Sequence, residues 1–205
     1  MAEPACFIFG AGPFYGLPVP PAPEDLIIAA DGGYRHCLAA GLTPQLLLGD
    51  FDSLGTPPAG CTIQTFPVEK DDTDSMLALK EGLGRGFRTF HLYGGTGGRM
   101  DHTLANLQGL CYLAEHGARG YLYDEHFVFT AVKNGSLALP SREEGIFSVF
   151  CLGADAQGVS IRGGKYPLTD YTLSAAFPLG VSNHFIGQPV EVSVREGCLL
   201  IGWEL

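Results

Sequence analysis

The sequence predicts an α/β protein in which a mostly parallel sheet with flanking helices is followed by a small all-β domain. Up to about residue 125, short apolar runs alternate with amphipathic ones, a pattern typical of parallel strands covered by helices. Beyond His126, short apolar or alternating runs are separated by glycine-bearing turns, which favours antiparallel sheets. We therefore expect two domains, residues 1–125 and residues 126–205.

The first domain divides into strands and helices at glycine and aspartate residues. Apolar runs predict strands over 5–9, 26–30, 45–48, 62–66, 87–93 and 121–123. Gly41 and Pro44 close a short helix after the second strand. Met76, Leu79 and Leu83 at helical spacing predict a helix over 75–83, with a carboxylate or hydroxyl placed to cap its first turn.

The clearest helix of the sequence begins at Asp101 or His102 and ends at Gly117. One face carries a regular apolar series, made of Leu104, Leu107, Cys111 and Ala114. In the second domain, strands are expected over 127–132, 147–152, 159–162, 190–194 and 199–203. The last of them contains Trp203, the only tryptophan, which we expect in the core or at a dimer interface.

Composition excludes several classes of protein. With 205 residues, 46% of them hydrophobic and 17% charged, the chain can bury one sizeable core or two small ones, so it is not mainly disordered. A net charge of -10 opposes generic binding to nucleic acid or anionic lipid. No apolar run reaches the roughly 18 residues that a membrane span requires, and we expect a soluble cytoplasmic protein. The six cysteines form no CxxC pair, which favours buried free thiols without a catalytic role.

The acidic residues gather at the ends of predicted elements. Asp31, Asp50 and Asp52 each follow a strand, and a cluster from Asp71 to Asp74 precedes a helix, so these side chains can share one crevice of an open sheet. Turn formation alone explains Asp31, and helix capping by Asp71 or Asp74 explains part of the cluster. Asp50 and Asp52 repel one another unless a cation neutralises them, which favours a hard divalent metal such as magnesium.

A glycine-rich turn supplies the complement to these carboxylates. Residues 94–98 contain four glycines and join a strand to the start of the strongest helix, which exposes backbone N–H groups to anionic oxygens. Arg99 adds donors for phosphate. No Gly-Lys-Ser/Thr follows, and no GxGxxG fingerprint is complete. A tight turn before a capped helix is the alternative interpretation, and His102 by itself can be an ordinary first-turn residue.

Taken in order, the motifs of this sequence resemble those of the thiamine pyrophosphokinase family. In the first half they are Asp31-Gly32-Gly33, Gly49-Asp50-Phe51-Asp52-Ser53, Asp71-Asp72-Thr73-Asp74, and Gly95 through Gly98-Arg99-Met100-Asp101-His102. In the second half they are Gly164-Lys165-Tyr166-Pro167-Leu168 and Gly180-Val181-Ser182-Asn183. No single motif is sufficient, but the ordered set is specific and covers nearly the whole chain.

The resemblance implies a Rossmann-like α/β catalytic domain followed by a β-sandwich, in a homodimer whose thiamine sites lie between subunits. It implies the transfer of an intact diphosphate from ATP to the hydroxyethyl oxygen of thiamine, giving thiamine diphosphate and AMP. Attack at the β-phosphorus depends mainly on alignment and on stabilisation of charge. Mg²⁺ is the implied cofactor and ATP the co-substrate.

Residue by residue, the resemblance implies three groups of site residues. Metal ligands that also serve catalysis are Asp50, Asp52, Asp71 and Asp74, with Arg99 and Asp101 as further catalytic residues. The nucleotide side is implied to comprise Asp31, Thr73, Gly95, Gly97, Gly98, Arg99 and His102. The thiamine side is implied to comprise Tyr166, Leu168, Ser182 and Asn183. Which aspartate acts as the base stays open.

The sequence departs from the usual family wording in two places. Tyr34, Arg35 and His36 follow the first Asp-Gly-Gly where smaller residues are common, and Gly163-Gly164 precedes Lys165 in place of Gly-Leu. These differences leave open the shape of the nucleotide pocket and of the turn that presents the tyrosine after Lys165. Neither removes an implied ligand.

Two other functions compete with this interpretation. Residues 46–54 resemble the strand and Asp-x-Asp pair of a haloacid-dehalogenase-type phosphatase, but Lys70 and Lys80 are poorly placed for the lysine that such an enzyme needs. A non-enzymatic nucleotide or vitamin sensor keeps the pockets but needs fewer carboxylates, so the acidic surplus counts against it.

Overall fold

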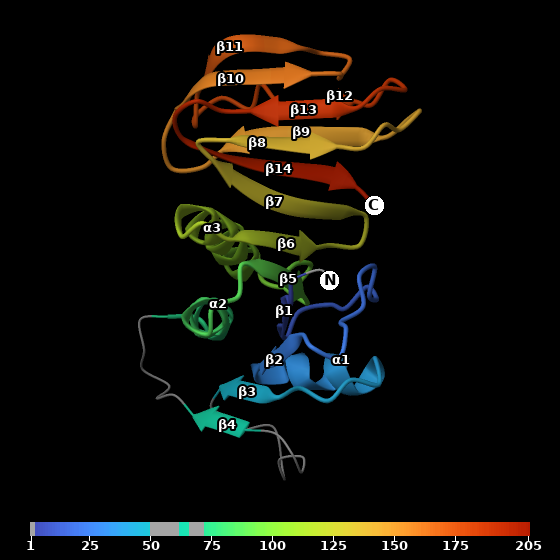
Figure 1. The fold of residues 1–205 in the computed structure, drawn as a ribbon, viewed down its shortest axis with the longest axis vertical. Coiled ribbons are helices and arrows are strands. Elements are labelled where there is room, and N and C mark those ends of the chain that lie inside the picture. Colours follow the sequence, from blue (N-terminus) through green and yellow to red (C-terminus); the bar gives the residue numbers. More distant parts are fainter. Residues whose placement is uncertain (1–2, 50–61, 66–71) are drawn as a thin grey trace. The chain divides into compact units, whose positions relative to one another are not determined.

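Six strands form the sheet of the first part of the molecule (Figure 1). The computed structural model describes residues 3–49, 62–65 and 72–205. In spatial order the strands are β6 (Arg119–Tyr123), β5 (Thr89–Tyr93), β1 (Cys6–Phe9), β2 (Leu26–Ala30), β3 (Leu46–Gly49) and β4 (Thr62–Thr65). The pairs β1–β5, β1–β2, β2–β3 and β3–β4 are parallel, so the predicted mostly parallel sheet is confirmed.

Helices cover both faces of this sheet, which explains its continuous apolar strands. Every residue of β1, β2 and β3 is buried, as expected for parallel strands with both faces covered. The helical segments are η1 (Asp31–Gly33), α1 (Tyr34–Ala39), α2 (Asp74–Gly84) and α3 (Met100–Glu115). Figure 1 shows α1 and α2 on opposite sides of β1 and β2, and both helices contact these two strands.

The N-terminal ends of α2 and α3 differ in detail from the prediction. A hydroxyl caps α2, as one of the two predicted options: the Thr73 Oγ1 accepts a hydrogen bond from the Met76 N–H at 3.2 Å. The longer helix α3 begins at Met100 and not at Asp101 or His102, a one-residue difference at a helix end. It ends at Glu115, two residues before the predicted stop at Gly117, which lies in the following turn with a left-handed φ of 69° that favours glycine.

The predicted apolar face of α3 is wrong. Leu104 is 53% exposed, and Leu107, Cys111 and Ala114 are only half-buried. The buried face is instead made of Asn106, Gly109, Leu110 and Leu113. Asn106 and Gly109 interrupt the apolar pattern of this face. Asn106 donates a hydrogen bond to the loop before α3, and Gly109 lets α2 approach closely. The periodicity of apolar residues therefore pointed to the neighbouring face of the helix.

Aromatic rings line one face of the first sheet. Phe7 and Phe9 of β1 stack with His91 and Tyr93 of β5, with ring centroids 4.6 Å apart for Phe7–His91 and 5.3 Å for Phe9–Tyr93. The His91 Nδ1 lies 2.9 Å from the hydroxyl oxygen of Tyr123. Burial lowers the pKa of His91 to about 4, because its imidazolium form loses hydration there.

Two antiparallel sheets share one core in the second part of the molecule. One has the order β12 (Asn183–His184), β9 (Ile146–Cys151), β14 (Cys198–Glu204) and β7 (Phe127–Lys133). The other has the order β11 (Leu168–Leu173), β10 (Ala156–Arg162), β13 (Val190–Ser193) and β8 (Ser136–Leu139). Side chains of both sheets belong to a single hydrophobic cluster, including Phe147 and Ile201 from the first and Val159 and Val192 from the second. Trp203 packs against this cluster, as one of the two predicted options.

Three strands of this part were not predicted. They are β8, β11 and β12, and the exposed edge strand β11 has only one fully buried residue, Leu173, which leaves almost no apolar pattern to read. Within the described residues the chain divides into two compact units, one of residues up to 109 with 120–125 and one of 110–119 with 126–205. The boundary at residue 125 stays a prediction.

Cysteine burial follows the prediction only in part. Cys6, Cys37 and Cys151 are buried free thiols, whereas Cys111 and Cys198 are free thiols that are half-buried. Cys61 lies outside the described residues. In the part of the chain that is described, none of the helices has both the length and the apolar character needed to cross a membrane.

Candidate functional site

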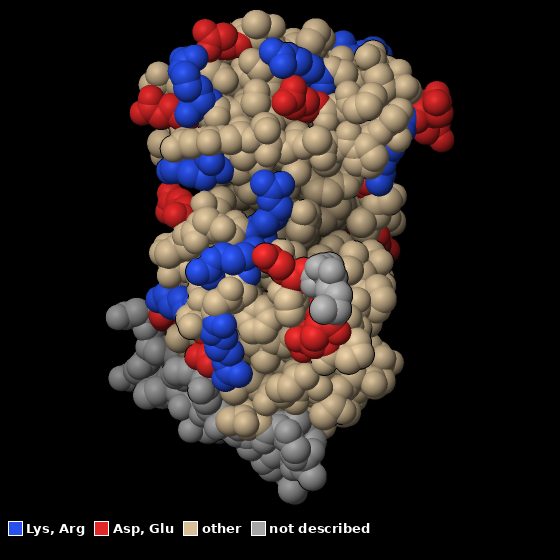
Figure 2. Space-filling view, viewed as in Figure 1, with Lys and Arg blue, Asp and Glu red and all other residues tan. Residues whose placement is uncertain are grey.

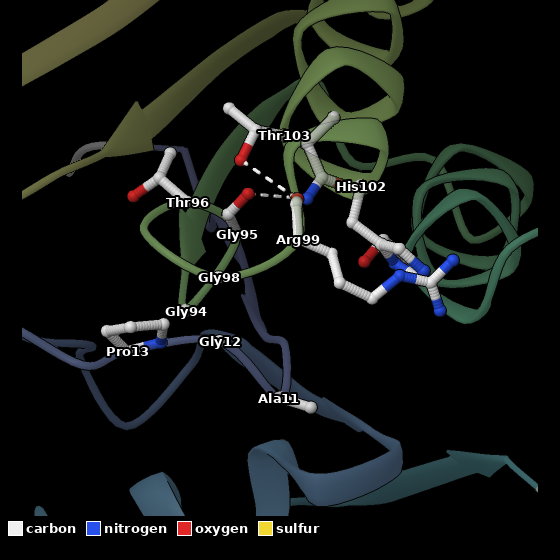
Figure 3. A pocket seen from close by; sticks show the side chains of 12 residues that line it. Ala11, Gly12, Pro13, Gly94, Gly95, Thr96, Gly98, Arg99, His102 and Thr103 are labelled. Atoms are coloured by element: carbon white, nitrogen blue, oxygen red, sulfur yellow. Dashed lines mark hydrogen bonds between the residues drawn. The ribbon is translucent and has the colours of Figure 1, made fainter.

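A cavity of about 330 Å³ opens where β1 and β5 end (Figure 3). Loops after the two strands and the first turns of α2 and α3 contribute its walls. Carboxyl ends of parallel strands are the usual place for a ligand in an open α/β sheet. The lining residues are Ala11, Gly12, Pro13, Ser75, Gly94, Gly95, Thr96, Gly98, Arg99, His102, Thr103 and Asn106.

The two loops touch through their backbones. The N–H groups of Gly10 and Gly12 donate hydrogen bonds to the carbonyls of Tyr93 and Gly94, each at 2.8 Å. A Cβ on Gly94 would collide with the Gly10 carbonyl, and the φ of Gly94 is +64°. A Cβ on Gly12 would lie 2.7 Å from the Gly94 oxygen. Side chains are therefore excluded at both positions, which leaves backbone groups to form the floor of the cavity.

Buried polar side chains hold the glycine-rich loop in place. The Asn106 Nδ2 donates to the Gly95 carbonyl at 2.8 Å, and the Thr96 hydroxyl donates to the Asp124 carboxylate at 2.5 Å. Thr96 and Asn106 are both among the few buried polar residues. Sequence reasoning missed all three side chains; the only available signal was that Thr96 interrupts a run of glycines and that Asn106 interrupts an apolar helix.

Arg99 and His102 both project from the start of α3 beside the cavity (Figure 3). The Arg99 guanidinium forms an ion pair with Asp101, with an Nη2–Oδ2 distance of 2.6 Å. This pairing lowers the pKa of the Asp101 carboxyl and raises that of Arg99. Because the two side chains are 63% and 73% exposed, the pair adds little stability, and an anion can replace the carboxylate at low cost.

The structure describes one of the four aspartates implied as metal ligands. Asp50, Asp52 and Asp71 lie outside the described residues. Asp74 is the first residue of α2 and is half-buried. Among the residues that the structure describes, no three His, Cys, Asp or Glu side chains form a group that could hold a metal ion.

The neighbours of Asp74 are engaged in local contacts. Asp72 forms an ion pair with Lys80 at 2.7 Å, so this lysine is directed to a surface carboxylate. Thr73 caps α2, and Ser75, two residues further on, lines the cavity of about 330 Å³. The first turn of α2 therefore reaches that cavity through Ser75, whereas Thr73 does not line it, and its place on the nucleotide side stays a prediction.

Asp31 and Gly97 flank the cavity without lining it. Asp31 has a φ of 48°, a left-handed conformation that is costly for a residue other than glycine. Gly97 has a φ of 73°, and a Cβ there would collide with the Tyr15 hydroxyl. His36 is one of the residues at which the sequence differs from the usual family motif. Its imidazole Nε2 lies 2.7 Å from the Gly12 carbonyl oxygen, and its ring stacks on Phe14. This larger residue therefore joins α1 to the cavity loop.

A second cavity, of about 240 Å³, lies in the all-β part. Three of the four residues implied for the thiamine side line it, and Ser182 does not. Tyr166 is 56% exposed, and the Lys165 ammonium lies 5.5 Å from the centroid of its ring. The lining residues are Ile161, Tyr166, Leu168, Leu179, Gly180, Val181 and Asn183. The arrangement is a mostly apolar pocket with one aromatic ring and one buried amide, which suits a flat organic ligand.

Asn183 holds the backbone of Tyr166 from both sides. Its Oδ1 accepts a hydrogen bond from the Tyr166 N–H at 2.9 Å, and its Nδ2 donates to the Tyr166 carbonyl at 2.7 Å. The Ser182 N–H donates to the Ser148 Oγ at 3.0 Å, which directs Ser182 into a turn with a φ of 58°. Asn183 is therefore a positioning residue for the tyrosine in addition to lining the pocket.

Two family models match separate parts of the chain. Residues 22–122 match the family model described as thiamin pyrophosphokinase, catalytic domain, and residues 136–199 match the one described as thiamin pyrophosphokinase, vitamin B1 binding domain. A thiamine pyrophosphokinase of Bacillus subtilis is 28% identical over 183 residues, which cover 86% of each chain.

Solved structures give the same result. The crystal structure of thiamine pyrophosphokinase from Bacillus subtilis superposes with a TM-score of 0.87 at 26% identity and covers 98% of this chain and 99% of its own. Thiamin pyrophosphokinase from Geobacillus thermodenitrificans has a TM-score of 0.84 at 27% identity, with 98% and 97% of the two chains covered.

These matches define an enzyme with a catalytic part and a separate vitamin-binding part. It is a diphosphotransferase by the name that its relatives share. The chain belongs to the thiamine pyrophosphokinase family.

Proposed function

We propose that this enzyme transfers the terminal diphosphate of ATP to the hydroxyethyl oxygen of thiamine, producing thiamine diphosphate and AMP. The observation that carries the proposal is that each matched segment contributes most of the residues of a cavity suited to one of the two substrates. The Tyr166 cavity lies wholly within residues 136–199, and α3 with its preceding glycine-rich loop lies within residues 22–122.

The cavity at the glycine-rich loop suits the polyphosphate of a nucleotide. Backbone groups of Gly94, Gly95 and Gly98 line it without intervening side chains, and Arg99 offers a guanidinium at its rim. Backbone N–H groups and a guanidinium are the donors that bind phosphate oxygens most directionally. In this proposal Arg99 leaves Asp101 for a phosphate oxygen when ATP binds.

The cavity at Tyr166 suits thiamine. An aromatic face favours a flat, cationic ring, and the Asn183 amide retains one N–H beyond the donor used by Tyr166. Lys165 already lies above the tyrosine ring, so a cationic ligand on that face would displace its ammonium. We infer that Leu168 and the apolar wall of the pocket exclude water from the remainder of the ligand.

The proposed metal cofactor is Mg²⁺. The donor set implied by the sequence, Asp50, Asp52, Asp71 and Asp74, fits this ion because it consists only of carboxylate oxygens. When bound there with ATP, Mg²⁺ would supply neutralisation of phosphate charge. An aspartate of this set or Asp101 would accept the proton of the thiamine hydroxyl. Homodimerisation, with the thiamine site between subunits, is part of the same proposal.

The test is a reconstituted reaction. Purified protein is incubated with ATP, Mg²⁺ and thiamine, and AMP and thiamine diphosphate are followed by chromatography while each component is omitted in turn. Equal amounts of the two products, in the complete mixture only, are expected. Inorganic phosphate released without thiamine would point to a phosphatase, and binding of both ligands without product would contradict the proposed reaction.

Two substitutions separate chemistry from binding in this assay. Asp50→Asn is expected to abolish turnover while the circular dichroism spectrum is unchanged, since it removes a proposed metal ligand. Tyr166→Ala is expected to raise the KM for thiamine with a smaller effect on kcat. Full activity of Asp50→Asn would show that the metal assignment is wrong.

A further inference from the structure

Two half-buried cysteines lie side by side within the second unit. Cys111 is on α3, Cys198 is the first residue of β14, and their thiols are hydrogen-bonded to each other. Because the two residues are 87 positions apart, only the fold brings them together. Neither belongs to the two cavities described above.

A neighbouring ion pair holds the same two elements together. Glu115 follows Cys111 by one helical turn, so both side chains lie on one face of α3. Lys133 of β7 is the direct cross-strand partner of Cys198. The Lys133 Nζ lies 3.2 Å from the Glu115 Oε1. Two contacts, one between thiols and one between charges, therefore join α3 to the paired strands β14 and β7.

The two thiols differ in acidity. The hydrogen bond from Cys111 and the positive charge of Lys133 lower the pKa of Cys198, and together they outweigh burial and the Glu115 carboxylate, which raise it. The same hydrogen bond and burial raise the pKa of Cys111. Burial also raises the pKa of Cys6 and of Cys151. Of Cys6, Cys111, Cys151 and Cys198, only Cys198 has a lowered pKa, and Cys111 lies beside it as a resolving thiol.

We propose that Cys111 and Cys198 form a reversible intramolecular disulfide when the protein meets a hydroperoxide. The Cys198 thiolate attacks a peroxide oxygen, the O–O bond breaks, and a sulfenic acid and hydroxide result. The Cys111 sulfur then attacks the sulfenic sulfur, the S–O bond breaks, and the Cys111 proton leaves with the departing hydroxide as water. The two sulfurs lose two electrons, and hydrogen peroxide is reduced to two waters.

The disulfide would fix α3 to β14 covalently. Residues 110–119 already belong to the second unit, so the link restrains a contact that exists and requires no rearrangement of the units. The helix that it restrains begins directly after Arg99 and carries His102 on its first turn. The inference does not depend on which substrate the enzyme uses.

Peptide mapping tests the link directly, because trypsin places the two cysteines in separate peptides with no other cysteine. Cleavage after Arg99, Arg119 and Arg195 yields peptides 100–119 and 196–205. Native protein is treated with a small excess of hydrogen peroxide, alkylated, and digested without reduction. We expect one cross-linked species whose mass is two hydrogens below the sum of the two peptides and which disappears after treatment with dithiothreitol.

Variants distinguish this pair from the other cysteines. Cys111→Ser and Cys198→Ser should each abolish the cross-linked species, and the matched control Cys151→Ser should leave it unchanged. Lys133→Met should slow alkylation of Cys198 by iodoacetamide several-fold in the unoxidised protein, because the thiolate loses its cation. This rate would not respond to Lys133→Met if the pair were merely packed together.

Three results would overturn the proposal. They are complete alkylation of both cysteines after peroxide, a disulfide that joins two chains on a non-reducing gel, and a link that forms only in denaturant. A sulfinic acid at Cys198 without any cross-link would also do so, since it would show that Cys111 does not reach the oxidised sulfur.

Discussion

The two cavities of this enzyme are built in different ways. In the first, glycines and their backbone groups form the floor, and buried polar side chains anchor the loop from behind. In the second, apolar side chains form the wall, and a single amide fixes the backbone of the exposed tyrosine. The comparison teaches that a cavity floored by glycine backbone tolerates almost no added atoms, whereas the cavity around Tyr166 is held in shape by one hydrogen-bonded amide.

The charge distribution bears on how the first cavity could bind an anion. The chain carries a net charge of -10, and Figure 2 shows acidic and basic side chains together on one face, separated by uncharged ones. In the proposed function, binding of ATP therefore depends on local donors such as the loop amides and Arg99, and not on the overall charge.

Adding a methyl group at the first cavity is expected to have the largest effect. Gly94→Ala should lower kcat/KM by at least about a hundredfold and destabilise the protein by about 1–3 kcal/mol, since the Cβ meets the Gly10 carbonyl at a positive φ. Turnover and urea unfolding measure this. The matched control is Gly86→Ala, at a φ of 93° with open space around it, which should cost only about 1 kcal/mol and keep activity. Equal losses in both variants would contradict steric exclusion.

Acid should destabilise the first part through His91. The folded-state pKa of about 4 lies below the unfolded value of 6.5, so the unfolded chain binds the proton first. Stability is then complete above about pH 6.5 and falls by about 3 kcal/mol as the pH drops to about 4. Urea unfolding at several pH values measures this loss, which should shrink in His91→Phe. The described members of the hydrophobic cluster in the second part include no histidine, so that cluster should not contribute to this loss. An equal loss of stability in the unsubstituted protein and in His91→Phe would show that His91 is not its cause.

Removing the clamp at the second cavity should have an intermediate effect. Asn183→Ala is expected to destabilise the protein by about 1–3 kcal/mol, because it leaves the Tyr166 backbone groups without their partners. We expect the KM for thiamine to rise more than kcat falls. Calorimetry and steady-state kinetics measure the two effects. Tyr166→Phe, which keeps the backbone groups of that position, is the control for the ring hydroxyl. An unchanged KM in Asn183→Ala would refute the positioning role.

The smallest effect is expected at the exposed pair of the first cavity. Asp101→Asn should leave the stability of the protein almost unchanged, because both partners are exposed. Since the proposed function has ATP phosphate replace this carboxylate at Arg99, the KM for ATP should change several-fold at constant kcat. A hundredfold fall in kcat at unchanged KM would instead identify Asp101 as the base.

Sequence patterns predicted the parts of this structure that depend on local chemistry. The strands of the parallel sheet and the glycine-rich loop before α3 were predicted, because apolar runs and glycines carry their own conformational preference. The contact of Thr96 with Asp124 was not, since it joins residues whose proximity is set by two different strands. The buried face of α3 was misjudged because Asn106 and Gly109 serve tertiary contacts that hydropathy does not report.

The continuity of α3 has a consequence for dissecting the protein. Its first ten residues belong to one compact unit, and residues 110–119 that follow belong to the other, before β6 returns to the first. A fragment ending at residue 125 would retain Leu110 and Leu113, both fully buried in the intact chain, without the 126–205 segment that forms one unit with them. Because each compact unit is made of two separate segments of the chain, truncation at a single position cannot yield either unit intact. The catalytic part and the vitamin-binding part therefore have to be studied together on one chain.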